Sequence, residues 1–130
     1  MGIKINISDK ILDVNLDKLK QDKINELNLK CSDDIEKGTL CNNGNFYRFN
    51  KEEDQINFSQ QLLEIIDGTA SDVVYWKTEN NGIIVHSHEE FKIVFRELGD
   101  YKKQLIAKYW QLKYNILSVT TIQEIRNIVW

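Results

Sequence analysis

The sequence has no proline, two cysteines, two histidines and one methionine among its 130 residues. Two cysteines, Cys31 and Cys41, do not make the disulfide framework of a small secreted domain, so we expect both to be small, buried or half-buried side chains. His86 and His88 form a His-x-His pair, but zinc needs three or four ligands and the chain has no further histidine. We therefore expect no metal and no cofactor.

Long apolar runs and an excess of positive charge are also lacking. No window approaches 18 apolar residues, and the first residues do not form a signal peptide, so we expect no membrane contact. Lysine and arginine number 17 against 20 acidic residues, and the formal net charge is -3. Lys102-Lys103 is the longest basic cluster, whereas proteins that bind nucleic acid normally carry a basic stripe. Nucleic acid is therefore not an expected partner.

Motifs for catalysis are missing as well. The six glycines are scattered singly, so there is no glycine-rich phosphate loop, and no Gly-x-Ser-x-Gly elbow occurs. The cluster of Asp33, Asp34 and Glu36 lacks the alternating ligand spacing and the glycine of a calcium loop. Glu52-Glu53-Asp54 falls in the first turn of a predicted helix, where carboxylates are expected. We predict that the chain is not an enzyme and has no small-molecule substrate.

What remains is a chain with 42% apolar residues, long enough for a core of its own. Ile3, Ile5 and Ile7 alternate with polar residues, which predicts a half-buried strand that pairs within the fold or with a neighbouring subunit. We expect residues 1–14 to form an N-terminal strand or arm, and residues 15–130 to form a single α+β domain.

The rest of the chain alternates helical patterns with turn signals. A helix is predicted from Asn15 to Glu36, with Gly38 as its stop. Asn-Gly at 43–44 and at 81–82 predicts two β-hairpins with type I′ turns. Each hairpin is followed by a helix, one capped by Asn50 with Glu53 and ended by Gly68, the other capped by Ser87 with Glu90. Threonines 120 and 121 predict a last helix.

The organising element is the long helix predicted over residues 87–119. Its main seam has apolar residues at steps of four and three, which is typical of a packed or coiled helix. The seam consists of Phe91, Phe95, Leu98, Lys102, Leu105, Tyr109, Leu112 and Ile116. A second apolar line consists of Val94, Tyr101, Ile106, Trp110, Tyr114 and Leu117. Two apolar faces indicate contacts on both sides of the helix, and Gly99 leaves open whether it breaks into two segments.

These patterns give a set of candidate interface residues. The N-terminal strand, the second line of the long helix and the terminal tryptophan contribute Ile3, Ile5, Ile7, Tyr101, Ile106, Trp110, Tyr114 and Trp130. Tryptophan and tyrosine dominate the energetic centres of protein interfaces, but in a small domain they equally fill the core. Trp130 is expected to dock on the core, and only one of Tyr75 and Trp76 need point inward from its strand. A homo-oligomer is left open.

The order of several segments resembles a protein family. A helix with Cys31 leads to Gly38, and Phe46-Tyr47-Arg48-Phe49 comes after it. Asp54-Gln55-Ile56-Asn57 comes next, and the chain closes on residues 121–130, Thr-Ile-Gln-Glu-Ile-Arg-Asn-Ile-Val-Trp. Over about residues 16–130 this resembles a family of small bacteriophage and prophage tail-associated proteins that have a C-terminal domain of unknown function.

The resemblance implies a structural component of a phage, prophage or phage-tail-like particle near the baseplate or the tail fibre. Such a component works by docking to other tail, baseplate or tail-fibre proteins. It would lie in the bacterial host cytoplasm during assembly and then in the virion or tail-like particle. The alternative is a tail-fibre assembly chaperone, a binding protein that the finished particle does not retain. The resemblance implies no catalytic residues.

Overall fold

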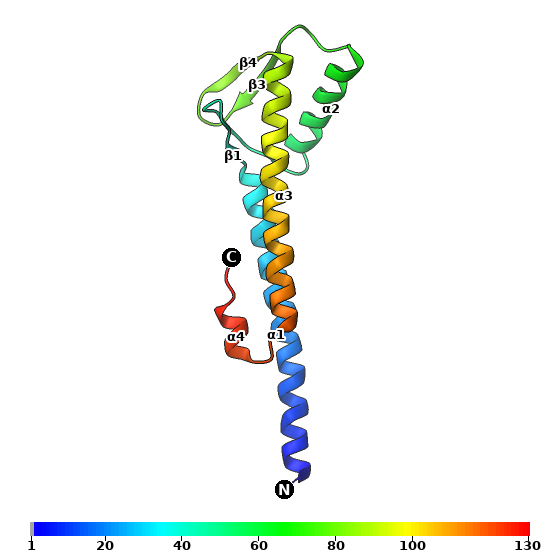
Figure 1. Cartoon of the computed structure of the whole chain (residues 1–130), viewed down its shortest axis with the longest axis vertical. Coiled ribbons are helices and arrows are strands. Elements are labelled where there is room, and N and C mark those ends of the chain that lie inside the picture. The colour runs from blue at the N-terminus through cyan, green and yellow to red at the C-terminus, as the bar shows by residue number, and fades with distance from the viewer. Residues whose placement is uncertain (1) are drawn as a thin grey trace. The chain divides into compact units, whose positions relative to one another are not determined.

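The computed structural model describes the backbone of residues 2–130 and the side chains of residues 15–130. The elements follow one another as α1 (Gly2–Lys37), β1 (Thr39–Leu40), β2 (Phe46–Tyr47), α2 (Asp54–Asp67), β3 (Val74–Thr78), β4 (Gly82–His86), α3 (His88–Ser118) and α4 (Ile122–Asn127). The fold class is α+β, as predicted, with helices and two two-stranded antiparallel sheets (Figure 1).

The chain divides into two compact units, and the two long helices each contribute to both. Unit 1 comprises Met1–Cys31 and Ile106–Trp130, and unit 2 comprises Ser32–Leu105. Unit 1 therefore consists of most of α1, the second half of α3, and α4. Unit 2 holds both hairpins, α2 and the first half of α3.

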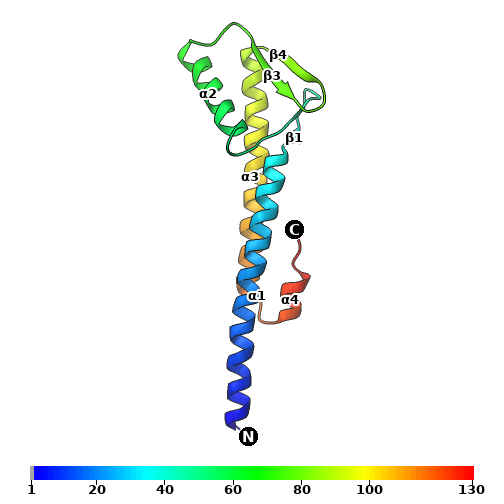
Figure 2. The same cartoon turned by 180° about the vertical axis from the view of Figure 1, so that it is seen from behind.

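In unit 1 the two long helices pack through a small apolar core. Ile24 and Leu27 of α1 form this core with Ile116 of α3, and each of the three side chains is at most 6% exposed. Lys20 Nζ donates to the carbonyl of Leu117 at 3.2 Å, in the last turn of α3. After α3 the chain turns back, so that α4 and the last residues lie beside these helices (Figures 1 and 2). Ile128 packs against the core from this segment.

In unit 2 an aromatic cluster forms the core. Phe58 of α2 is 1% exposed, and its ring centroid lies 4.7 Å from that of Trp76 and 5.3 Å from that of Phe91. Phe91 belongs to the first turn of α3, so α2 and the β3–β4 hairpin both pack on this half of the helix. Because aromatic rings bury large areas, a few of them are enough to hold these short elements together.

The turns of the two hairpins are joined by asparagine side chains. Asn80 accepts from the backbone N–H of Phe46 at 2.8 Å and donates to the carbonyl of Gly44 at 3.0 Å. Asn81 Nδ2 donates to Asn45 Oδ1 at 2.7 Å. These hydrogen bonds satisfy loop backbone and side-chain groups directly, which fixes one turn against the other.

The strand predicted over residues 3–7 is wrong, since this segment is the beginning of α1. Alternation over five residues is too short to distinguish a strand from part of a helix. Ile3, Ile7, Ile11 and Val14 also recur at steps of four, four and three, which is the helical period, and no glycine or proline separates them from the next helix. Asn15 accordingly lies inside α1 and does not cap it.

Most of the local stop and start signals are confirmed. Gly68 ends α2 in the left-handed conformation with φ of 82°. The Ser87 hydroxyl accepts from the N–H of Glu90 at 3.1 Å, and that of Thr121 accepts from Glu124 at 3.2 Å. These caps satisfy backbone donors that have no partner within the helix. The helix α3 continues through Gly99 without a break.

Two details of the turns differ from the prediction. Both hairpins form, but Asn43 and Asn81 do not take the positive φ that a type I′ turn needs, and only Gly44 and Gly82 do. The loops are longer than two residues, because Leu40 pairs with Phe46 and Thr78 pairs with Gly82. The helix α2 begins at Asp54, later than predicted: Asn50 caps the preceding turn through the N–H of Glu52 at 2.9 Å.

Candidate interaction surface

The second half of α3 carries an exposed apolar stripe in unit 1. Trp110, Tyr114 and Leu117 are 65%, 68% and 57% exposed. They follow one another at steps of four and three, so they lie on one face of the helix. The opposite side of the same helix is buried through Ile116, which is fully covered. We call Trp110, Tyr114 and Leu117 the α3 stripe.

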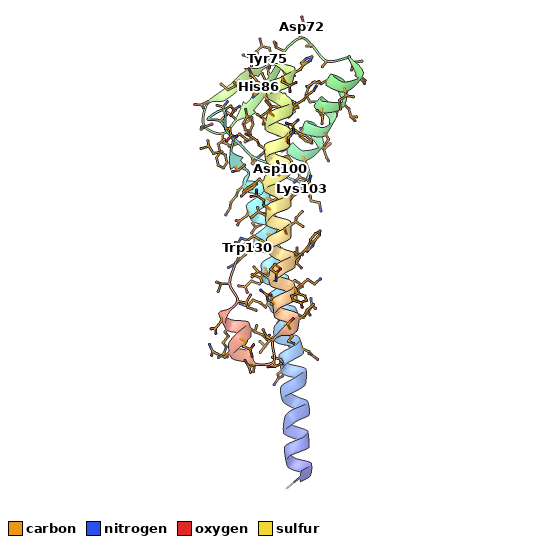
Figure 3. All side chains as sticks on the ribbon, in the orientation of Figure 1. Asp72, Tyr75, His86, Asp100, Lys103 and Trp130 are labelled. Atoms are coloured by element: carbon orange, nitrogen blue, oxygen red, sulfur yellow. The ribbon has the colours of Figure 1, made fainter. Side chains whose placement is uncertain are left out.

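The other candidate interface residues of unit 1 lie closer to the core. Ile106 is half-buried. Trp130, which is labelled in Figure 3, packs against the core of Ile24, Leu27 and Ile116, as expected for a terminal tryptophan. Lys108 Nζ lies 4.1 Å from the centre of its ring. A cation in this position is attracted to the face of the indole ring. Trp130 thus serves the packing of unit 1.

Tyr101 lies in unit 2 and makes a hydrogen bond within that unit. Its hydroxyl donates to the carbonyl of Asp34 at 3.1 Å, and burial raises the pKa of its phenol above the ordinary value. The side chain is half-buried. The structure therefore does not place Tyr101 in the α3 stripe. The side chains of Ile3, Ile5 and Ile7 lie outside the described residues.

The two histidines have separate structural partners. His86 is 1% exposed on β4, where Nε2 lies 2.5 Å from the Tyr47 hydroxyl and Nδ1 lies 2.9 Å from the carbonyl of Ile84. His88 Nε2 lies 2.5 Å from the carbonyl of Ser71. Within the described part of the chain, no three side chains of histidine, cysteine, aspartate or glutamate come together to hold a metal.

Cys41 is buried beside the carboxylate of Glu97. Burial raises the pKa of the Cys41 thiol to about 12, and the hydrogen bond to Glu97 and its negative charge act in the same direction. Glu97 Oε2 accepts from the backbone N–H of Asn42 at 3.2 Å, which holds the carboxylate against the β1–β2 loop. Reactive cysteines have a lowered pKa and are partly exposed, whereas Cys41 is buried and its pKa is raised, which fits a packing role.

A second exposed apolar surface lies on the outer face of the β3–β4 hairpin. Tyr75 pairs across the strands with Val85, and the two side chains are 68% and 50% exposed (Tyr75 is labelled in Figure 3). Ile83 is 72% exposed on the same face. Of Tyr75 and Trp76, Trp76 is the one that points inward. Ile83 and Val85 were not predicted to be surface residues, although the run Ile83-Ile84-Val85 has no polar residue for an outer face.

The model of a domain of unknown function, DUF4376, matches residues 18–129, and the chain belongs to this family. No curated protein and no solved structure matches it significantly. Across the described residues, none of the helices combines the length and apolar character needed to cross a membrane.

Proposed function

We propose that this DUF4376-family chain is a structural component of a phage, prophage or phage-tail-like particle, near the baseplate or the tail fibre. It acts by docking to other tail proteins and not by catalysis. In this role it is made in the cytoplasm of the bacterial host and ends in the assembled particle. The α3 stripe is the observation that carries the proposal, together with the resemblance of the segments between residues 16 and 130 to tail-associated proteins.

The α3 stripe has the composition of an interface centre. Tryptophan and tyrosine contribute most to binding free energy where a partner covers them, and both are present at adjacent turns of one helix. Their exposure of 65% and 68% means that folding alone leaves this area in contact with water. A partner that buries the stripe would recover the free energy of transferring these side chains out of water. An assembly protein with many neighbours is expected to present such a face.

The proposal is tested by asking where the protein is found. Particles are purified from the bacterial strain that carries the gene, after induction, and their protein content is quantified by mass spectrometry. We expect the chain in a fixed ratio to the tail proteins. A chain that is abundant in the lysate but missing from the purified particles would be an assembly chaperone instead, and the structural role would be rejected.

A double variant then tests the surface. Trp110→Ser with Tyr114→Ser should leave the circular dichroism spectrum unchanged but remove the chain from the particles. Tyr75→Ser is the matched control, since Tyr75 is as exposed as Tyr114 but lies in unit 2. Incorporation of the double variant at the level of the control would show that the α3 stripe is not the docking surface.

A further inference from the structure

Unit 2 contains a groove in which polar side chains of α2 face an aromatic ring of β3. Its volume is about 280 Å³, and it is lined by Asn57, Gln60, Gln61, Glu64 and Trp76. The four residues of α2 follow one another at steps of three, one and three, so they lie on one face of the helix. The groove uses none of the residues of the α3 stripe.

The groove offers both hydrogen-bond donors and acceptors, with little charge. Each side-chain amide of Asn57, Gln60 and Gln61 carries two N–H donors and a carbonyl acceptor. Gln61 Nε2 donates to Glu64 Oε2 at 3.4 Å, which orders this pair at one end. Of the side chains described by the structure, Glu64 is the only charged one that lines the groove. An anionic ligand would find no cation here, and a metal ion would find one carboxylate.

The aromatic wall is held rigidly. The Trp76 ring centroid lies 4.7 Å from that of Phe58 and 5.0 Å from that of Phe91, so the indole ring is fixed from the core side. The side chain is half-buried, and its remaining surface borders the groove. A ring that is already ordered loses no conformational entropy when a ligand packs on it.

A ligand that fits this arrangement has hydroxyl groups that both donate and accept, and an apolar face of C–H groups. A sugar ring has both: its hydroxyls match side-chain amides, and its C–H face packs on an indole ring. The volume lies just below the range of about 300–1,000 Å³ of sites for drug-sized ligands, which is room for one ring. We propose that the groove between α2 and β3 binds a neutral saccharide, with Trp76 as the platform and Asn57, Gln60 and Gln61 as hydrogen-bonding partners.

The test is a titration of the full chain followed by ¹H–¹⁵N NMR. The probes are the methyl glycosides of glucose, galactose, mannose and N-acetylglucosamine at millimolar concentrations. We expect at least one of them to shift the side-chain amide signals of Asn57, Gln60 and Gln61 and the indole N–H signal of Trp76, in a saturable manner. The signals of Trp110 and Trp130 should stay in place. If none of the four glycosides moves the groove signals, the inference is wrong.

A double variant distinguishes binding in the groove from binding elsewhere. Asn57 and Gln60 are exposed, so Asn57→Ala with Gln60→Ala should fold normally and lose two hydrogen-bonding partners. We expect the dissociation constant for the bound glycoside to rise about tenfold or more. Gln111→Ala, an amide removed from an exposed position of α3, is the control and should bind like the original chain. An unchanged affinity of the double variant would overturn the inference. The result is independent of the proposed role in a tail particle.

Discussion

The hydroxyl of Tyr47 lies 2.5 Å from Nε2 of His86, and both side chains are 1% exposed. The direction of this hydrogen bond is set by its neighbours. The carbonyl of Ile84 only accepts, so His86 Nδ1, 2.9 Å away, carries a hydrogen and Nε2 is left to accept. Asn43 and Asn45 donate to the Tyr47 oxygen at 3.0 and 3.5 Å, so its hydrogen is available for His86.

We expect Tyr47→Phe to destabilise the fold by about 1–3 kcal/mol, because it leaves the buried Nε2 of His86 and the amide of Asn43 without this partner. The measurement is urea denaturation, with the midpoint lowered and the slope unchanged. Tyr75→Phe removes the same hydroxyl from a side chain that is 68% exposed and should change the stability by less than about 0.5 kcal/mol. Equal effects of the two variants would show that the Tyr47–His86 hydrogen bond contributes no stability.

This network also marks the limit of sequence reasoning. The hairpins were predictable because Asn-Gly lies between β-prone runs, and the caps Ser87 and Thr121 were predictable because a cap acts within three residues. The contact of Tyr47 with His86 joins residues 39 positions apart. It depends on how two hairpins pack, and no local pattern encodes that.

The candidate surface was predictable in the same partial way. The helical period placed Trp110 and Tyr114 together on one face of α3 and the seam residue Ile116 on another. It could not tell which face is covered, because that depends on α1 and α4. The second apolar line of α3 is buried at Val94, in unit 2, but exposed at Trp110, in unit 1. The groove beside Trp76 was missed, since its polar residues on α2 have the composition of an ordinary solvated face.

Stability is expected to fall in alkaline solution, in part because of Cys41. Burial and Glu97 raise the pKa of the folded thiol from 9.0 to about 12. Between these values the unfolded chain loses the proton while the folded chain keeps it, so the thiol's contribution to the free energy of unfolding is complete below pH 9 and decreases as the pH rises toward 12. The raised pKa values of Tyr47 and Tyr101 act in the same direction.

The measurement is urea denaturation at several pH values above neutrality. Cys41→Ala should show a smaller loss of stability between pH 9 and pH 12 than the original chain, because the thiol contribution is removed and the tyrosine contribution stays. If the free energy of unfolding falls equally with pH in the two proteins, the folded thiol ionises as readily as the unfolded one.

Gly38 ends α1 where no other residue fits. Its φ is 77°, and a Cβ at this position would lie 1.8 Å from the carbonyl oxygen of Tyr47 and 2.7 Å from Cα of Arg48. Both obstacles are backbone atoms, which cannot turn aside as a side chain does. We expect Gly38→Ala to lower the free energy of unfolding by about 3 kcal/mol or more, from the left-handed conformation and the overlap together.

Gly44→Ala separates these two contributions. Gly44 has a φ of 85°, but a Cβ there would meet no atom within 4 Å. This variant should cost only the about 1–2 kcal/mol of the left-handed conformation. Both variants are compared by thermal unfolding followed by circular dichroism. If Gly38→Ala is no worse than Gly44→Ala, α1 and the Tyr47 backbone do not approach each other as the structure shows.

Two neighbouring residues of α3 distinguish its buried seam from its exposed stripe. Ile116 is 0% exposed, whereas Leu117 is 57% exposed. We expect Ile116→Ala to lower the free energy of unfolding by about 2–5 kcal/mol, because it leaves a cavity in the core with Ile24 and Leu27. Leu117→Ala should change it by less than about 0.5 kcal/mol. Urea denaturation of both variants checks the pair, and the reverse order would mean that the helix presents its other face to the core. If the α3 stripe is the docking surface proposed above, Leu117→Ala should also weaken partner binding while keeping its stability, which is the behaviour of an interface residue and not of a core residue.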